Sequence, residues 1–514
     1  MTHQDTLYAS MDELLAATTF AGRPALDLIR EIQSLYLEDD RPWVIGFSGG
    51  KDSTTVLSLV YVALSRLSEA QRRKHIYVIS SDTLVETPMV VDMVTGMIEA
   101  INHKAAEQGL PMSAHVVYPR WDQTFWANLL GKGYPAPTQH FRWCTERMKI
   151  DPVSEFIKDK IHRFGEVIVV LGARSDESAS RAQVIAKHKI EGSSLSRHAS
   201  LPGAFTYMPI EDWSFDEVWM YLLGAPAPWG GDHFELFSLY KDSSAGECPL
   251  VIDTKTPSCG NSRFGCWTCT VVTKDRAIEG LIDSGEVWLQ KLKNFRNKLY
   301  ATNDPKNKDQ YRNFKRRTGR IQYARTQSDG EASERKTIPG PYWLNYRKAW
   351  LRELLTIEKE LNDSGHAVQL IRLEELHAIR REWMHDPNEP DWSDSLPAIY
   401  RDVYGEDLDW ANQDAGGFTQ ADSDLLTALG AEHGVSAELV MKLLELELSM
   451  VGLARRRGLF EKMESLLKRD WGSLEEIQAA KEKTQPESRL RERLESTYDE
   501  QLKSLAKEYE GLQA

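Results

Sequence analysis

The chain has 514 residues, 41% of them hydrophobic, and a formal net charge of −14 at pH 7. This length allows two or three domains with sizeable cores, and the negative charge argues against a protein that coats nucleic acid nonspecifically, although it does not exclude one basic patch. No apolar run approaches the ~18 residues that span a bilayer, and residues 1–22 lack the basic start and apolar core of a secretory signal, so we expect a soluble, cytoplasmic protein without a membrane partner.

Strands and helices alternate through the first half of the chain. Residues 1–40 have the apolar spacing of a helical lead-in, and helices are predicted at about 53–69 and after Pro88. Apolar runs predict strands at residues 44–47, 75–80, 114–118 and 166–171. This alternation predicts an α/β fold with a doubly wound, mainly parallel sheet in residues 41–240, where ligands bind at the carboxyl ends of the strands.

The first predicted strand runs directly into a polar, glycine-containing loop and a helix. The loop residues are Ser48, Gly49, Gly50, Lys51, Asp52, Ser53 and Thr54. Glycines let the backbone approach an anion, a helix N-terminus offers free N–H groups, and the hydroxyls and Lys51 add further donors. The spacing differs from Walker A, which has four residues between its first Gly and its Gly-Lys pair. The loop resembles instead the PP-loop of the ATP pyrophosphatases, which implies ATP as ligand, with Mg²⁺ that Asp52 helps to position.

Two further motifs follow predicted strands. The strand at 75–80 leads into Asp82-Thr83 and then Glu86-Thr87, and the strand at 166–171 leads into Gly172, Arg174, Glu177 and Arg181. Together with residues 206–222, these motifs resemble the PAPS-reductase-type branch of the PP-loop superfamily, an adenine nucleotide alpha hydrolase-like fold. The resemblance implies that Asp82, Gly172, Arg174, Glu177 and Arg181 help to bind the nucleotide. The forked donors of the two arginines suit phosphate oxygens.

Four of the five cysteines lie close together in residues 241–290. They are Cys248, Cys259, Cys266 and Cys269, with the spacing C-x10-C-x6-C-x2-C. In a cytosolic protein this clustering indicates metal or redox chemistry rather than disulfides. Four thiolates suit either zinc or a [4Fe-4S] cluster. We favour the iron–sulfur cluster, because zinc more often uses two CxxC hairpins and only one is present.

Cys144 stands alone in the stretch Arg142-Trp143-Cys144-Thr145-Glu146-Arg147-Met148-Lys149. Cationic neighbours are expected to lower the pKa of its thiol and so make the thiolate available. Cys144 either replaces Cys248 as a cluster ligand or is the thiol that carries sulfur. We favour the sulfur carrier, because the later four cysteines already form a complete set.

The rest of the chain changes character. Residues 291–325 carry twelve Lys or Arg against two Asp, interleaved with aromatic residues, which is typical of a nucleic-acid-binding segment in residues 291–330; a solvated helical face is the alternative. Residues 331–514 are predicted to form a helical C-terminal region. Apolar rows between residues 436 and 459 fit either a core or a groove for a partner.

The PP-loop, the reductase-like motifs, the cysteine spacing and the basic extension together resemble the DndC-type sulfurtransferases of bacterial DNA phosphorothioation. The resemblance implies that ATP adenylates a DNA phosphodiester with release of pyrophosphate, and that sulfur then displaces AMP. It implies ATP, Mg²⁺ and a [4Fe-4S] cluster as cofactors, and Lys51, Asp52, Cys144 and Arg174 as catalytic residues. The implied partners are DNA, a cysteine desulfurase and other phosphorothioation proteins of the DndD and DndE type.

Other functions share parts of this pattern. A PAPS or APS reductase uses the same frame without splitting ATP, but such reductases end in a cysteine-bearing tail and this chain has no Cys after Cys269. A tRNA thiolase shares the adenylation step with RNA as its substrate, and the SspD-type proteins of single-strand phosphorothioation share the PP-loop. A cluster-bearing assembly scaffold is the non-enzymatic alternative.

Overall fold

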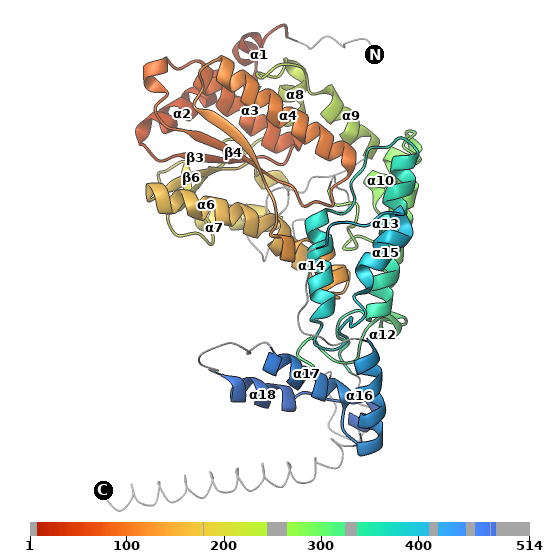
Figure 1. The fold of residues 1–514 in the computed structure, drawn as a ribbon. Helices are drawn as coiled ribbons and strands as arrows, with labels where there is room; N and C mark the ends of the chain where they lie inside the picture. The colour runs from red at the N-terminus through yellow and green to blue at the C-terminus, as the bar shows by residue number, and fades with distance from the viewer. Residues whose placement is uncertain are drawn as a thin grey trace, which may run out of the picture. The chain divides into compact units, whose positions relative to one another are not determined.

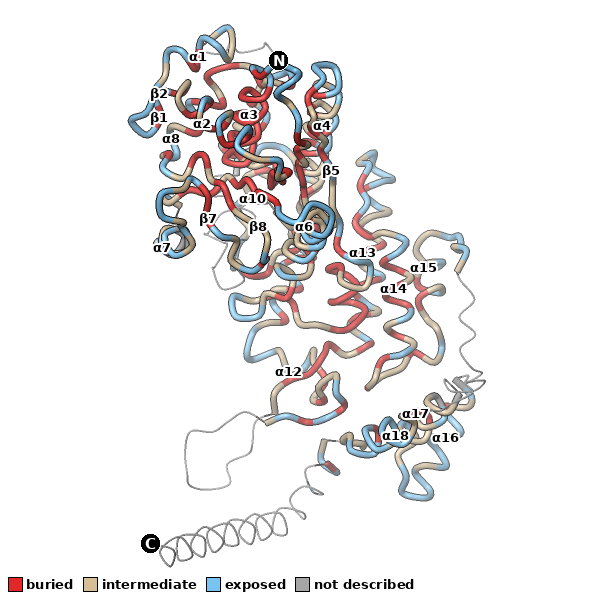
Figure 2. Tube along the Cα trace, turned by 90° about the vertical axis from the view of Figure 1, so that its left-hand side faces the viewer, coloured by how far each residue is buried: buried red, intermediate tan, exposed pale blue. Residues whose placement is uncertain are grey.

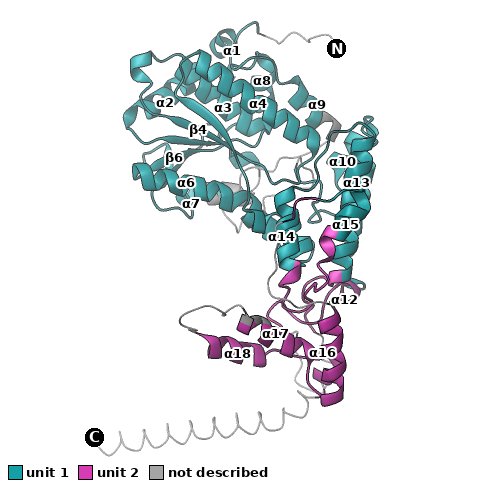
Figure 3. Ribbon diagram, in the orientation of Figure 1, with its two compact units in different colours: residues 1–307, 345–382, 398–407 teal, residues 308–344, 383–397, 408–514 magenta. Residues whose placement is uncertain are grey.

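The computed structural model describes residues 8–177, 179–243, 265–323, 337–410, 420–448, 458–472, 474–477 and 479. The chain divides into two compact units, coloured separately in Figure 3. Unit 1 comprises Met1–Asn307, Asn345–Glu382 and Ala398–Asp407, and unit 2 comprises Lys308–Leu344, Trp383–Pro397 and Leu408–Ala514. No helix in the described ranges is long and apolar enough to cross a membrane.

Unit 1 is built on a six-stranded sheet with the strand order β5-β4-β3-β6-β8-β7. The strands are β3 (Trp43–Gly46), β4 (Ile76–Ser81), β5 (Met112–Val117), β6 (Val167–Val170), β7 (Leu195–Arg197) and β8 (Ala204–Tyr207). All neighbouring pairs are parallel except β7 with β8 at one edge. The predicted mainly parallel α/β sheet is therefore confirmed, with β7 and β8 added to the strands that the sequence indicated.

The central strands are buried on both faces, which explains their continuous apolar sequences. Every residue of β3 and β6 is buried, and Ile45 lies opposite Val170 in their parallel register. Side chains alternate between faces, so Trp43 and Ile45 join one core whereas Val44 joins another with Val169. Figure 2 shows this concentration of burial in the strands and the helices packed on them.

Helices cover both faces of the sheet, as the doubly wound fold requires (Figure 1). One face carries α2 (Ala25–Glu38), α3 (Lys51–Ser65), α4 (Pro88–Glu107) and α8 (Phe215–Gly224), and the other carries α6 (Asp151–Phe164) and α7 (Ala179–His188). The helix predicted at 53–69 is α3, which begins two residues earlier and ends sooner. Within the predicted helical lead-in, a short hairpin of β1 (Thr19–Phe20) and β2 (Arg23–Pro24) separates α1 (Met11–Ala17) from α2.

The remaining elements are mostly helical. Those lying wholly or mostly in unit 1 are α5 (Trp143–Thr145), α9 (Phe234–Ser243), α10 (Arg276–Asp283), α11 (Leu289–Ala301), α13 (Leu344–Asp363), α14 (Leu373–Met384) and α15 (Ser395–Tyr404). Unit 2 contains α12 (Lys308–Tyr311), α16 (Gln420–His433), α17 (Ala437–Leu448) and α18 (Leu459–Leu467). Short 3₁₀ turns are η1 (Glu69–Gln71), η2 (Trp121–Gln123) and η5 (Ser175–Glu177), and π turns are η3 (Ala127–Gly131) and η4 (Glu146–Ile150).

Candidate nucleotide and thiol site

The loop between β3 and α3 has the geometry of an anion-binding turn. Gly49 adopts φ +73°, and a Cβ there would lie 2.3 Å from Cγ2 of Val94, so the position requires glycine. Helix α3 begins at Lys51 after the N-cap residue Gly50, which offers no side-chain acceptor. The amide groups of this first helical turn are those that the sequence predicts to bind an anion, and the Lys51 N–H among them donates to the Tyr240 hydroxyl at 3.5 Å.

The hydroxyl groups of the loop have different roles from one another. Oγ of Ser53 donates to the Gly50 carbonyl at 3.0 Å and accepts from the Ser48 backbone N–H at 3.2 Å, so it ties the turn together. Ser48 is exposed and remains able to meet a ligand. Thr54 is completely buried within α3. Its hydroxyl has no hydrogen-bond partner among the described residues, and the role of Thr54 as a donor to the anion stays a prediction.

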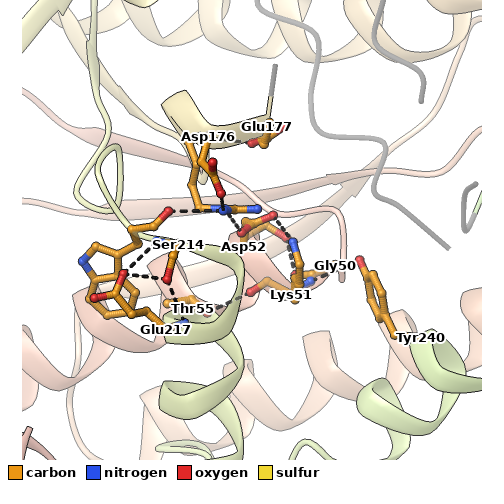
Figure 4. A network of polar contacts seen from close by, with 12 residues as sticks. Gly50, Lys51, Asp52, Thr55, Asp176, Glu177, Ser214, Glu217 and Tyr240 are labelled. Carbon is orange, nitrogen blue, oxygen red and sulfur yellow. Dashed lines mark hydrogen bonds and ion pairs between the residues drawn. The ribbon is translucent and has the colours of Figure 1, made fainter. Parts of the chain in front are cut away.

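Three buried charged side chains meet at the start of α3, and Figure 4 shows two of them, Lys51 and Asp52, side by side. Nζ of Lys51 lies 2.7 Å from Oδ2 of Asp52, and Nε of Arg174 lies 2.6 Å from Oδ1 of the same carboxylate. The three side chains are only 2–4% exposed. Two cations and one carboxylate leave a net charge of +1 in this buried triad, which favours an anion bound above it.

The strand-end motif after β6 forms the other half of this arrangement. Gly172 packs so closely on α3 that a Cβ would lie 2.6 Å from the backbone carbon and oxygen of Asp52. Arg174 is fixed by donating from Nη1 to the Trp213 carbonyl at 3.2 Å, while its backbone N–H donates to Glu177 at 3.0 Å. The predicted residues Gly172, Arg174 and Glu177 are therefore brought to the PP-loop. Arg181 lies on α7, and its side chain is outside the described part of the structure.

Burial changes the protonation chemistry of the triad. It lowers the pKa of Lys51, and the neighbouring Asp52 carboxylate opposes that effect. Both oxygens of Asp52 are engaged by cations at hydrogen-bond distance. In this arrangement Asp52 orients Lys51 and Arg174, and it would have to release one of them before it could help to position Mg²⁺.

Asp82 follows β4 and lies on the loop next to the PP-loop strand. Its Oδ1 accepts from the Leu84 backbone N–H at 2.8 Å. Burial raises the pKa of Asp82, and the positive charge of Arg372 at the start of α14 acts in the opposite direction. Arg372 was not indicated by the sequence, since no motif connects it with the nucleotide-binding domain.

The same loop, residues 82–87, carries the CxxC segment. Oγ1 of Thr83 lies 3.3 Å from Sγ of Cys266, Glu86 forms an antiparallel bridge with Cys266, and the Trp267 N–H donates to the Val85 carbonyl at 3.0 Å. The Cys269 N–H donates to the Cys266 carbonyl at 3.0 Å and closes the turn. The CxxC turn is thus attached to the carboxyl edge of β4.

Cys144 lies beside this turn, at the point where α5 passes into the π turn η4. Its thiol is close enough to Cys269 for the two to interact electrostatically. Although both residues keep some solvent exposure, burial around the sulfur raises the pKa of Cys144 to about 11 and that of Cys266 to about 12. The positive charge of Lys149 lowers the pKa of both thiols, but it offsets only part of the rise caused by burial. The expectation that cationic neighbours lower the pKa of Cys144 is therefore wrong, because desolvation outweighs them.

Arg296 anchors the chain that follows Cys269. This fully buried side chain on α11 donates to the carbonyls of Cys269 at 2.8 Å and Thr273 at 2.9 Å, and also to that of Val272. The sequence placed Arg296 among the nucleic-acid-binding cations. The signal that could have distinguished it is its position within the apolar row Leu292, Phe295 and Leu299, all buried.

The chemistry of the thiols suits a soft metal centre, but the described residues do not complete one. Among them, no three His, Cys, Asp or Glu side chains are arranged to hold a metal ion. Cys248 and Cys259, two of the four predicted ligands, lie outside the described residues. Cys266 and Cys269 supply two thiol donors, and the thiol of Cys144 interacts electrostatically with that of Cys269.

Three lysines of the basic segment form ion pairs within unit 1. Lys291 pairs with Glu360 at 2.7 Å, Lys293 with Glu279 at 3.1 Å, and Lys298 with Glu353 at 2.5 Å. Phe295 is buried in the core rather than available for stacking. The nucleic-acid interpretation therefore loses support for α11 and depends on the residues that follow it.

A glycine-bearing loop at the carboxyl edge of a parallel sheet, with a buried cationic base, is the arrangement expected of a PP-loop. Residues 42–272 match the phosphoadenosine phosphosulfate reductase domain. This part of the chain, less than half of its length, therefore has a PAPS reductase-like fold, and the match includes the loop, both strand-end motifs and the CxxC turn.

Two uncharacterized proteins of Methanocaldococcus jannaschii are similar in sequence. One is 27% identical over 228 residues, which are 43% of this chain and 41% of that protein. The other is 23% identical over 200 residues, which are 39% of this chain and 40% of that protein. The chain thus matches about two fifths of the length of either relative.

Two solved structures have weak similarity. One is the FMN adenylyltransferase of Candida glabrata with FAD and pyrophosphate, at 13% identity and a TM-score of 0.25, covering 41% of this chain and 62% of that one. The other is the U34-tRNA thiolase NcsA of Methanococcus maripaludis with its [4Fe-4S] cluster, at 15% identity and a TM-score of 0.24, covering 43% of this chain and 76% of that one. Similarities this weak say nothing about the chemistry of this chain.

Proposed function

We propose that this protein uses ATP to activate a DNA phosphodiester for the replacement of a non-bridging oxygen by sulfur. One observation carries the proposal: residues 82–87 join the nucleotide edge of the sheet to the CxxC turn, through Asp82 at one end and the contacts of Thr83 and Glu86 with Cys266. An activating nucleotide and a sulfur-handling thiol would thereby act on the same phosphodiester group.

The nucleotide half of the reaction uses the PP-loop and the buried triad. Amides at the start of α3 and the net positive charge of Lys51, Asp52 and Arg174 would hold the β- and γ-phosphates of ATP and stabilise the charge that develops on departing pyrophosphate. A non-bridging oxygen of the DNA phosphodiester would attack the α-phosphorus. The bond from the α-phosphorus to its bridging oxygen would break, and pyrophosphate would leave with the electron pair. Mg²⁺ would neutralise the same phosphates.

The thiol half uses Cys144, Cys266 and Cys269. These thiols, together with Cys259, would hold a [4Fe-4S] cluster in the arrangement in which Cys144 replaces Cys248. The raised pKa values of Cys144 and Cys266 mean that their thiolates are costly without a cation, so a metal centre would be needed to keep them ionised. Because of its nearness to Cys269, Cys144 is now the better candidate for a ligand than for a free sulfur carrier.

Sulfur would arrive as a persulfide from a cysteine desulfurase partner. Attack by its terminal sulfur on the activated DNA phosphorus would form the P–S bond and expel AMP with its oxygen. A second thiol would then cleave the S–S bond, which leaves the phosphorothioate on DNA and a disulfide between the two thiols. The two thiols lose two electrons when they form this disulfide, and these electrons reduce the terminal sulfur of the persulfide to the level of the phosphorothioate, so the step balances.

Pyrophosphate release tests this proposal. Anaerobically purified protein is incubated with ATP, alone and with DNA, and pyrophosphate is measured. We expect DNA-dependent release that is lost in Lys51→Ala and retained in Asp176→Asn, whose exposed carboxylate lies 3.7 Å from Nη1 of Arg174.

Three other outcomes would each point away from DNA activation. Absence of pyrophosphate with every nucleic acid would rule out activation by adenylation. Stimulation by tRNA in place of DNA would indicate an RNA thiolase. Reduction of a sulfonucleotide without splitting of ATP would indicate a reductase.

A further inference from the structure

Unit 2 contains a small cavity whose lining is strongly basic. It has a volume of about 320 Å³, at the lower end of the range of about 300–1,000 Å³ for ligand sites. Its walls carry Lys442 of α17, Lys462 and Ser465 of α18, Arg469 just beyond α18, and His385 beyond α14. The other lining residues are apolar. All the lining residues are described, and none of them is acidic, although acidic residues outnumber Lys and Arg by 77 to 63 in the whole chain.

Two carboxylates close to lining residues in the sequence, those of Asp386 and Glu464, have polar partners in the described part of the chain. Asp386 accepts at Oδ1 from the backbone N–H groups of Asn388 at 2.9 Å and Glu389 at 3.0 Å. Glu464 pairs with Lys468 at 2.5 Å on the outer side of α18. Lys442 is 8% exposed, so its charge is held in the wall of the cavity rather than dispersed in solvent.

A second basic element packs against the cavity. The turn Arg316–Arg320 is closed by hydrogen bonds from the Arg316 N–H to the Arg320 carbonyl at 2.9 Å and from the Gly319 N–H to the Arg316 carbonyl at 2.8 Å. The stem of Arg469 lies along Gly319, where a Cβ would be 2.7 Å from Cδ of the arginine. The turn is also fixed by Asp470, whose N–H donates to the Gly319 carbonyl at 2.9 Å and whose Oδ2 accepts from the Ile321 N–H at 2.6 Å.

We propose that this cavity and the Arg316–Arg320 turn bind the phosphodiester backbone of the DNA substrate. Arginine, lysine and a serine hydroxyl are the groups that contact backbone phosphates. Because the lining has no Phe, Tyr or Trp side chain, and His385 is its only aromatic ring, it favours backbone contact over base stacking. The adjoining turn extends the positive surface beyond one phosphate, which suits a strand better than a mononucleotide. The inference rests on the proposed function for the identity of its ligand.

The test measures DNA binding by the full-length protein as a function of salt. A fluorescein-labelled DNA duplex is titrated by anisotropy with the wild type, with Lys462→Ala and with Lys468→Ala. Lys462 is exposed, so its removal is compatible with folding. Lys468 is the matched control, because it is an exposed lysine at the C-cap of the same helix, is paired with Glu464 and does not line the cavity. Circular dichroism verifies that all three proteins are folded.

We expect Lys462→Ala to raise the dissociation constant several-fold for duplexes of any sequence, and to reduce the slope of log K against log salt by about 0.9. Lys468→Ala should leave both unchanged. Equal behaviour of the two variants would overturn the proposal. AMP is added as a competitor to the same duplex, and displacement of the duplex by AMP that depends on Lys462 would assign the cavity to a free nucleotide instead.

Pyrophosphate release by the same variants separates this inference from the proposed function. If DNA stimulates release but Lys462→Ala binds DNA normally, the cavity assignment fails and the function stands. If no nucleic acid stimulates release but Lys462→Ala loses DNA binding, the function fails and the DNA-binding assignment stands. Lys51→Ala should abolish release without changing the salt slope.

Discussion

Replacement of Asp52 by asparagine removes the only negative charge of the buried triad while preserving its shape. Lys51 and Arg174 would then face each other as two buried cations, each having lost an attraction at 2.7 or 2.6 Å. At an effective dielectric constant of about 20, a single such pair at 4 Å gains about 4 kcal/mol before desolvation is counted. The amide keeps some hydrogen bonding, so we expect a net loss of about 3–5 kcal/mol, typical of a broken buried ion pair.

The pH dependence of this loss has a definite sign. Burial already lowers the pKa of Lys51, and Asp52 opposes that shift, so Asp52→Asn should lower the pKa further. A lysine whose pKa falls in the folded state binds fewer protons there than in the unfolded state, so stability rises with pH as far as the unfolded pKa. The deficit of Asp52→Asn should therefore be largest near neutral pH and shrink as the pH rises toward about 10, where Lys51 can lose its proton.

Native-state hydrogen exchange of the β3 and α3 amides measures this loss locally, which avoids treating a chain of two units as a single two-state system. Asp176→Asn is the control, since this 67% exposed carboxylate contacts the same arginine and should cost less than about 1 kcal/mol. A deficit for Asp52→Asn no larger than that of the control, or one that does not change with pH, would refute the account of the triad.

Three further predictions address packing, pH and the thiol turn. Gly172→Ala should lower the free energy of unfolding by about 1–3 kcal/mol and weaken ATP binding, because the new Cβ would lie 2.6 Å from the Asp52 backbone. Gly96→Ala in α4 is the control: a Cβ there has nothing within 4 Å, so this variant should gain about 0.5–1 kcal/mol. Urea unfolding compares the two variants, and equal effects would contradict the packing argument. Burial raises the pKa of Glu375 to about 7. The protonated side chain therefore makes its full contribution to the free energy of unfolding below about pH 4.5, and this contribution is lost as the pH rises through 7. Glu375→Gln should therefore gain up to about 3 kcal/mol over the wild type at pH 8 and little at pH 4.5, and a constant difference in urea unfolding would speak against this assignment. Arg296→Lys should lower iron retention about 10–100-fold after anaerobic reconstitution. The guanidinium of Arg296 donates to the carbonyls of Cys269 at 2.8 Å and Thr273 at 2.9 Å, and a single ammonium group cannot replace both contacts. Lys298→Ala, at an exposed position on the same helix, is the control and should retain iron normally.

The parts of the fold that the sequence predicted correctly depend on local patterns. β3 and β6 were recognisable because strands buried on both faces are continuously apolar, and the start of α3 because the glycines and polar residues of its loop are adjacent in the chain. The β1–β2 hairpin was missed because each of its strands has only two residues, too few to show an alternation.

The errors at the candidate site have a common physical origin in long-range packing. Asp52 and Arg174 are 122 residues apart, and no local pattern shows that they neutralise each other. Nearby cations in the sequence suggested a reactive Cys144, but the pKa of that thiol depends on how deeply other segments bury it. Arg296 was counted as a surface charge because its carbonyl partners come from the segment after Cys269.

The attachment of residues 82–87 to the CxxC turn also has a thermodynamic consequence. Gly265 accepts from the Thr87 N–H at 3.3 Å and Cys266 pairs with Glu86, so a shift of this loop when a nucleotide binds must be transmitted to the thiols. Binding linkage is reciprocal: the factor by which ATP changes the affinity of the thiols for their cofactor equals the factor by which that cofactor changes the affinity for ATP. Loading of one site would therefore change the affinity of the other by the same factor, and ATP binding measured with and without the cofactor would give the sign and size of this coupling.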